Sequence, residues 1–119
     1  MQRKPTNNTR GPNADEKRFQ AWCKEQACCV CDNTGPSIVH HCEGSTFKHS
    51  KTLVGHWFVI PLCEACDDVI TKGNRRAFRD RFGPQSNLWD STVVNYQCDK
   101  EDFFIVPLDV FDAIMDWGR

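Results

Sequence analysis

The stretch that decides the fold runs from residue 28 to residue 66 and reads CCVCDNTGPSIVHHCEGSTFKHSKTLVGHWFVIPLCEAC. It begins with one Cys-x-x-Cys pair, Cys28 and Cys31, and ends with a second, Cys63 and Cys66. Zinc takes four soft ligands in a tetrahedron, and a Cys-x-x-Cys turn directs two thiolates toward one ion. Two such pairs predict one structural Zn²⁺, bound by all four cysteines, that clips the two ends of this stretch together.

The remaining cysteines permit another interpretation. The chain has eight cysteines, so a disulfide framework is the alternative to a metal site. The N-terminus from Met1 to Thr6 is polar and lacks the apolar segment of a secretory signal. This favours a reducing cytoplasmic compartment, although a mature secreted fragment would look the same. Cys29 and Cys42 are interpreted as packed thiols, which would become ligands only if the zinc pairs were shifted by one residue.

Length, composition and charge set the class of protein. A chain of 119 residues suggests one domain, and 39% hydrophobic and 26% charged residues are typical of globular proteins. No apolar run approaches the roughly 18 residues of a membrane helix, so we expect a soluble protein without a membrane partner. The net charge is −1, but residues 1–12 and 72–81 are basic, and Arg75, Arg76 and Arg79 are candidates for contacts with DNA phosphates. A solvated helix surface explains the second run equally well.

Turn and capping residues divide the chain into an expected α+β order. Prolines and Gly11 among polar residues indicate a disordered basic arm at 1–12, followed by one domain at 13–119 whose core spans about 28–83. Pro61 predicts that the strand before it ends or lies at a sheet edge. We expect helices at 13–26, 64–72, 75–82, 88–96 and 108–117, strands at 37–41, 57–60 and 103–106, and a loop at 42–55.

Within this order, a cysteine pair is followed by a strand ending in His40-His41, a loop, a second strand, the other cysteine pair and a helix. This order and spacing resemble the HNH, or His-Me finger, endonucleases, and within them the bacteriophage recombination-enhancement nucleases of the Ref type. The resemblance begins around residues 19–22 and covers about half of the chain. Its sharpest element is the interval from His41 to the Pro-Leu-Cys-x-x-Cys run at 61–66.

The resemblance implies a small zinc-stabilised ββα-metal core with additional helices, and the hydrolysis of phosphodiester bonds in DNA. It implies His41 as the general base, a task that suits histidine because its ordinary pKa lies near 6.5. It also implies His40 as a ligand of a catalytic divalent cation, Mg²⁺ or Mn²⁺. His56 and His49 are weaker candidates for bracing the loop or contacting metal or phosphate. The implied partners are DNA and a recombinase filament, in the cytoplasm of a bacterial host if the chain is phage encoded.

The chain departs from this family after the last zinc ligand. There the related nucleases usually have a metal-binding histidine, often with a second histidine one helical turn later, whereas this chain has Asp67 and Thr71. Either Asp67 serves as an oxygen ligand beside His40, because carboxylates suit hard cations, or the site is lost. The main hypothesis is therefore a metal-dependent DNA endonuclease. The alternatives are a catalytically inactive zinc protein that binds DNA or a recombinase, and a purely structural zinc module.

Overall fold

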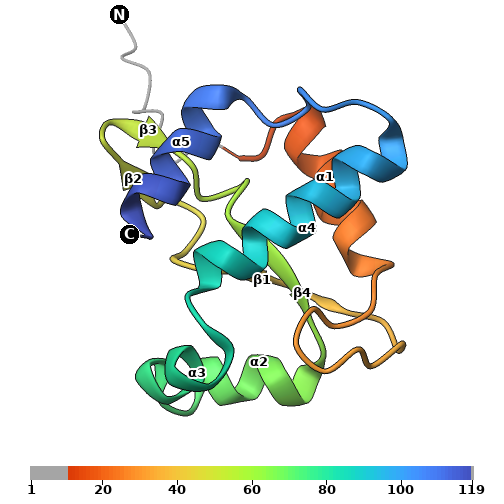
Figure 1. Cartoon of the computed structure of the whole chain (residues 1–119), viewed down its shortest axis with the longest axis vertical. Helices are drawn as coiled ribbons and strands as arrows, with labels where there is room; N and C mark the ends of the chain where they lie inside the picture. Colours follow the sequence, from red (N-terminus) through yellow and green to blue (C-terminus); the bar gives the residue numbers. More distant parts are fainter. Residues whose placement is uncertain (1–10, 119) are drawn as a thin grey trace, which may run out of the picture.

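The structure, a computed structural model, describes residues 11–118, so most of the predicted arm at 1–12 lies outside the described residues. Within the described range the chain is α+β, with five α-helices and two antiparallel sheets of two strands each (Figure 1). The helices are α1 (Ala14–Lys24), α2 (Glu64–Thr71), α3 (Arg75–Phe82), α4 (Gln85–Lys100) and α5 (Leu108–Trp117). The strands are β1 (Ile38–His41), β2 (Lys48–His49), β3 (Thr52–Leu53) and β4 (Val59–Leu62).

β1 and β4 form a sheet of two strands, so each of them is an edge strand. Pro61 lies inside β4, and its carbonyl oxygen accepts a hydrogen bond from the N–H of Cys29, outside the sheet. Since the N–H and C=O of one strand residue point to the same side, the missing N–H of Pro61 removes no hydrogen bond to β1. The predicted edge position of Pro61 is confirmed, although the strand begins two residues later than predicted.

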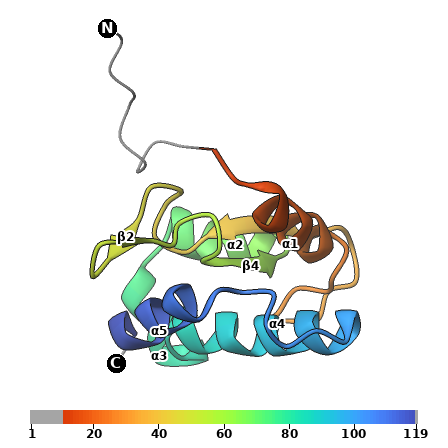
Figure 2. The same ribbon diagram turned by 90° about the horizontal axis from the view of Figure 1, so that it is seen from above.

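Several helices pack around the β1–β4 sheet. α1 packs against both strands and α4 packs against β4, and Figure 2 shows α4 below the sheet. α2 follows β4 directly and contacts both strands, while α5 packs on the β2–β3 hairpin. The core between these layers is aromatic, with Phe19, Phe58 and Trp89 fully buried. The indole N–H of Trp89 donates to the carbonyl oxygen of Trp57 at 2.7 Å, which ties α4 to the turn before β4.

Local signals explain where two of the helices begin and end. Asn13 and Glu16 form a capping box at the start of α1, and each side chain accepts the backbone N–H of the other residue at 2.8 Å. α3 begins after Asn74, whose side chain accepts the N–H of Arg76 at 2.8 Å. It ends at Gly83, where φ is +86°, a value that favours glycine. The predicted boundaries of α3 are confirmed, and α1 ends two residues before the predicted end.

The predicted strand at 103–106 is wrong, because these residues form turns between α4 and α5. α4 is longer than the predicted helix at 88–96, so little chain remains before Pro107 starts α5. The Asp102 side chain accepts the N–H of Phe104, which stabilises a turn, and the Phe104 ring is 79% exposed. A run of β-prone residues therefore did not form a strand here, because its backbone groups are used in turns.

The loop predicted at 42–55 contains the short β2–β3 hairpin. Its two turn residues, Ser50 and Lys51, both have positive φ. A two-residue turn of this kind normally carries Asn or Gly, and the Ser-Lys sequence gives no such signal.

None of the helices in residues 11–118 combines the length and the hydrophobicity needed to cross a membrane.

Candidate metal centre and histidine site

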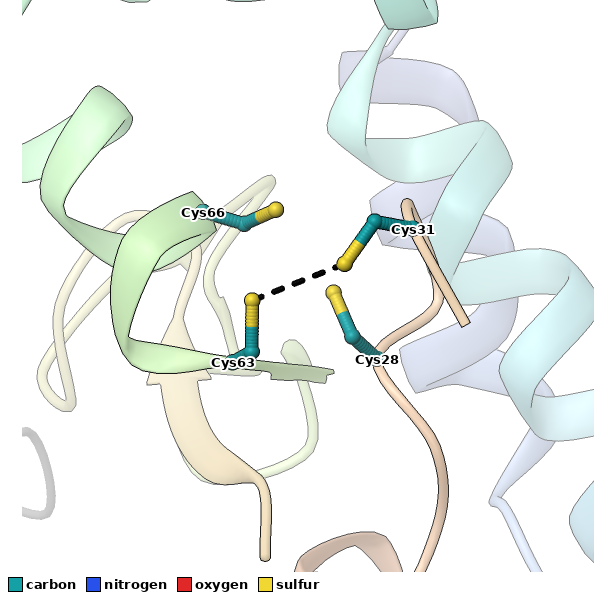
Figure 3. A group of neighbouring side chains, drawn as sticks. All are labelled: Cys28, Cys31, Cys63 and Cys66. Carbon is teal, nitrogen blue, oxygen red and sulfur yellow. Dashed lines mark hydrogen bonds between the residues drawn. The ribbon is translucent and has the colours of Figure 1, made fainter. Parts of the chain in front are cut away.

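The four cysteines of the two Cys-x-x-Cys pairs, called the cysteine cluster below, lie together as predicted. Their sulfur atoms are all within 4.8 Å of one another, and the Sγ atoms of Cys31 and Cys63 are 3.6 Å apart. Figure 3 shows Cys28 and Cys31 facing Cys63 and Cys66, with the sulfur atoms directed toward a common centre. All eight cysteines are free thiols, so the disulfide alternative is not realised. The cluster could hold a metal ion such as zinc.

Backbone geometry brings the two pairs together. The loop of the first pair closes on itself, because the N–H of Asp32 donates to the carbonyl oxygen of Cys28 at 2.9 Å. The same loop is held against β4 by the hydrogen bond to Pro61 described above. Cys63 is the N-cap of α2, so Cys66 lies in the first turn of that helix. A separation of three residues at a helix start places the two thiols on the same side of α2.

The environment of the cluster suits thiols that ionise when a metal binds. Burial alone would raise the pKa of the Cys28 thiol, but N–H groups of Cys63, Cys31 and Val30 donate to its sulfur and lower the pKa to about 7. Burial, followed by hydrogen bonding with the neighbouring thiols, raises the pKa of Cys66. Several thiolates in one small volume repel one another, and a divalent cation reverses that cost.

Cys29 and Cys42 lie outside the cluster, which settles the register of the two pairs. Cys42 is fully buried, and burial raises its pKa well above the ordinary value for a thiol. Burial, and then the charge of Cys28, raises the pKa of Cys29 to about 12. Both side chains are therefore neutral packed thiols at neutral pH, as predicted.

The two histidines at the end of β1 contact different partners. His40 is buried, and its Nδ1 atom lies 2.9 Å from Oδ1 of Asp67 in α2. His41 is half-buried, and its ring packs edge-on against the ring of His56 with 6.0 Å between centroids. Successive side chains of a strand point to opposite faces, which explains why His40 and His41 have different partners. The structure thus brings His40 to Asp67 and His41 to His56.

The second ring nitrogen of His40, Nε2, is buried and has no hydrogen-bond partner in the described part of the chain. Because a carboxylate only accepts hydrogen bonds, Nδ1 carries the proton that is donated to Asp67, and in the neutral ring the lone pair is then on Nε2. A buried lone pair without a partner costs free energy unless something binds it. Metal-binding histidines commonly donate their other N–H to a carboxylate in this way. The pair could therefore present Nε2 to a metal ion.

His41 is suited to accept a proton. Burial, and then the neighbouring His56 and His40, lowers its pKa below the ordinary value for histidine. At neutral pH the imidazole is therefore uncharged, which is the form that can act as a base. The segment that carries His56 is fixed to α1, because the Gln20 side chain donates to the carbonyl oxygen of His56 at 2.8 Å.

The other candidates lie on separate elements. His49, in β2, has its Nε2 atom 2.9 Å from Oδ2 of Asp116 in α5, so it braces the hairpin against that helix. The hydroxyl of Thr71 donates to the carbonyl oxygen of Asp67, within its own helix.

The three arginines of the predicted DNA contact, Arg75, Arg76 and Arg79, are exposed on α3. Arg75 lies 3.3 Å from the carboxylate of Glu43, two residues after His41, so α3 sits beside the end of the histidine strand. Sequence reasoning did not identify Glu43 as a partner of α3, because the two residues are 32 positions apart and no local pattern links them.

Fold and site together define a small α+β protein in which a four-cysteine cluster lies at one end of a two-stranded sheet, and a buried histidine of that sheet pairs with a carboxylate of helix α2. A family model with the description "Protein of unknown function (DUF968)" matches residues 5–99, which is most of the chain. The chain therefore belongs to the DUF968 family. The match includes the cysteine cluster, both histidines of β1 and all of α3, and it ends before α5. No curated protein and no solved structure matches the chain.

Proposed function

We propose that this protein is a metal-dependent DNA endonuclease that hydrolyses phosphodiester bonds, built on a zinc-stabilised ββα core of the HNH type. The order of β1, β4 and α2, with one cysteine pair before the strands and the other at their junction with the helix, supports this proposal. The observation that carries it is the buried His40 ring, fixed by Asp67 at Nδ1 and without a partner at Nε2, next to an uncharged His41.

The cysteine cluster is proposed to hold a structural Zn²⁺. In a tetrahedral site with Zn–S bonds of about 2.3 Å, neighbouring sulfur atoms are about 3.8 Å apart. The 3.6 Å between the sulfur atoms of Cys31 and Cys63 fits that geometry, and all four sulfur atoms lie within 4.8 Å of one another. The donor set is entirely thiol, which is typical of closed structural zinc sites.

In the proposed reaction His41 takes a proton from the attacking water, which forms the new P–O bond as the bond to the leaving oxygen breaks. A divalent cation, Mg²⁺ or Mn²⁺, would offset charge on the phosphate and on the leaving oxygen when bound. His40 would bind this ion through Nε2, and Asp67 would orient His40 and raise its basicity. The sequence-based hypothesis made Asp67 a direct ligand. The observed hydrogen bond supports the orienting role.

The test is a cleavage assay on plasmid, linear duplex, branched and single-stranded DNA in Mg²⁺, in Mn²⁺ and in EDTA. Wild-type protein should cleave with either metal, and His41→Ala should lower the rate by about 10²- to 10⁴-fold, the usual contribution of a general base. His49→Ala, which removes an imidazole held by α5 outside the proposed site, is the matched control and should retain cleavage. Unchanged DNA binding and melting temperature would show that His41→Ala acts on the chemistry.

The alternative is a zinc-containing accessory protein that binds DNA or a recombinase without cleaving. The specific observation that favours it is the replacement of the expected metal-binding histidines by Asp67 and Thr71, whose hydroxyl is used within α2. Zinc-loaded wild-type protein that cleaves none of these DNAs, alone or with a recombinase filament, would replace the enzyme proposal by this one. A role in phage recombination in a bacterial cytoplasm is part of the proposal and rests on the resemblance alone.

A further inference from the structure

A cavity of about 400 Å³ lies where α3, the start of α4 and the end of α5 meet, beside the segment that follows β1. We call it the arginine pocket. The charged, polar and aromatic residues that line it are Glu43, Arg75, Arg76, Arg79, Gln85 and Trp117. The size is within the range of pockets that hold small ligands. Neither the cysteine cluster nor the histidines contribute to its lining.

The charge of the pocket favours an anion. Three arginines line it against one acidic residue, Glu43, whose carboxylate pairs with Arg75 at 3.3 Å. Within residues 11–118, Arg76 and Arg79 have no acidic partner in an ion pair. Gln85 is the first residue of α4, so the N-terminal end of a 16-residue helix adds N–H groups and a partial positive charge on the same wall. Guanidinium groups are well suited to phosphate oxygens.

The Gln85 side chain indicates that the ligand of this pocket contains more than a phosphate. Its Oε1 atom has no hydrogen-bond partner among the described residues, and it is covered, so a ligand reaches it only after the Gln85 side chain turns into the pocket. A phosphate offers only acceptors to this oxygen, whereas the edge of a nucleobase offers amino or imino N–H donors. Trp117 supplies an aromatic wall, and its ring is held by edge-on contacts with Phe47 and Phe58 at 5.4 and 5.5 Å between centroids. The pocket therefore combines phosphate-binding cations with a polar and an apolar contact for a base.

The pocket adjoins the proposed catalytic residues. Glu43 lines it and follows His41 by two residues, so their Cα atoms are at most about 7 Å apart. We propose that the arginine pocket binds one nucleotide of an unpaired DNA strand, next to the phosphate hydrolysed at His41. A base inside a duplex is stacked and paired and cannot enter a pocket without being extruded. Single-stranded or branched DNA is thus the preferred substrate class, an inference that rests on the proposed endonuclease activity.

A binding experiment that needs no catalysis tests the pocket. Zinc-loaded protein without added Mg²⁺ is titrated with each of the four deoxynucleoside monophosphates and with inorganic phosphate, while the indole N–H signal of Trp117 is followed by NMR. At least one nucleotide should bind ten times more tightly than phosphate and shift that signal. Equal binding of all the nucleotides and inorganic phosphate, or no shift at Trp117, would overturn the proposal.

Two variants separate the contacts to base and phosphate. Gln85→Leu should bring nucleotide affinity to within about twofold of phosphate affinity and leave phosphate binding unchanged. Arg79→Gln should weaken both ligands. Arg81→Gln is the control, because Arg81 lies on another side of the same helix, over the ring of Phe82, and should change neither. If Gln85→Leu leaves nucleotide selectivity intact in a folded, zinc-containing protein, the base contact is wrong.

Cleavage then tests the substrate class separately from the activity. Single-stranded or branched DNA should be cut at least ten times faster than the matched duplex, and Gln85→Leu should reduce that preference. Equal rates on duplex and unpaired DNA would overturn the inference and leave the endonuclease proposal standing. Absence of cleavage on every substrate would overturn the endonuclease proposal, and the nucleotide titration would still decide whether the pocket binds a nucleotide.

Discussion

The contact between His40 and Asp67 joins the histidine strand to helix α2 through two side chains that are 27 positions apart. His40 is 7% exposed and the Asp67 side chain 20% exposed, so the hydrogen bond is largely shielded from water. A shielded carboxylate fixes the tautomer of the ring and strengthens the lone pair on Nε2. At the scale of single residues, this hydrogen bond determines the orientation of the His40 ring and which of its nitrogens carries the proton.

The bond predicts the effect of Asp67→Asn. The amide keeps the size of the side chain but loses its charge, so the affinity of the proposed cation site at His40 for Mn²⁺ should fall by about 10- to 100-fold, with a parallel loss of the proposed cleavage. Calorimetric Mn²⁺ titration of zinc-loaded protein measures this directly. Asp68→Asn is the matched control, because Asp68 is the next residue and pairs only weakly with Lys72 on the surface, at 3.5 Å. Equal Mn²⁺ affinity in wild type and Asp67→Asn would remove Asp67 from the site.

At the scale of elements, α3 carries one buried anchor residue and several exposed arginines along a single helix. Phe78 is buried and anchors the helix, whereas Arg75, Arg76 and Arg79 are exposed. An exposed arginine contributes little to folding, so these three positions can change without loss of structure. Helix α3 also contacts α2, which begins after Cys63 and contains Cys66, so the orientation of α3 depends on the cysteine cluster.

The three arginines predict the salt dependence of DNA binding. Changing all three to alanine should weaken binding to any DNA sequence and make the plot of log affinity against log salt less steep. Each lost phosphate contact removes about 0.9 from the slope on duplex DNA and about 0.7 on single strands. Fluorescence anisotropy between 50 and 200 mM salt measures the slope, with Arg81→Ala as the control. A triple variant with the wild-type slope would identify the run as a solvated helix face.

At the scale of the whole molecule, the cysteine cluster connects the loop after α1 with the junction of β4 and α2. The β1–β4 sheet has only two strands, and such a sheet is marginally stable without further support. Structural zinc sites contribute about 10 to 16 kcal/mol of apparent binding free energy, which is comparable with the total stability of a small protein.

Metal removal should therefore unfold the protein. Purified protein should contain one zinc per chain, and a strong chelator or Cys63→Ser should abolish the cooperative melting transition. Atomic absorption and circular dichroism provide the two measurements. Cys98→Ser is the control, because Cys98 is an exposed thiol outside the cluster, and it should melt like wild type. A zinc-free protein with an unchanged melting curve would contradict the structural role of the metal.

Alkylation gives an independent test of the same centre. With zinc bound, iodoacetamide at pH 7.5 should modify Cys98 alone, because the cluster thiols are ligated and the buried Cys23 and Cys42 and the partly buried Cys29 have raised pKa values. Brief chelation should add the four cluster cysteines to the modified set. Mass spectrometry identifies the sites, and rapid modification of the cluster in zinc-loaded protein would count against ligation.

Local sequence determined the parts of this protein that depend on short separations. The capping box at Asn13, the boundaries of α3 and the two Cys-x-x-Cys pairs all follow from residues within a few positions of one another. The α+β class was predictable for the same reason. The strand expected at 103–106 was wrong because β-propensity specifies a strand only when a partner edge is present, and there the backbone is used in turns.

Only the tertiary structure decided which distant side chains meet. The partner of His40, the neighbour of His41 and the walls of the arginine pocket come from segments separated by 15 to more than 70 positions, such as Glu43 and Trp117. The sequence lists the groups that can donate, accept or bind a metal, but the free energy of a buried contact depends on distance and shielding from water. Those two quantities are set by packing, and packing is a property of the whole chain.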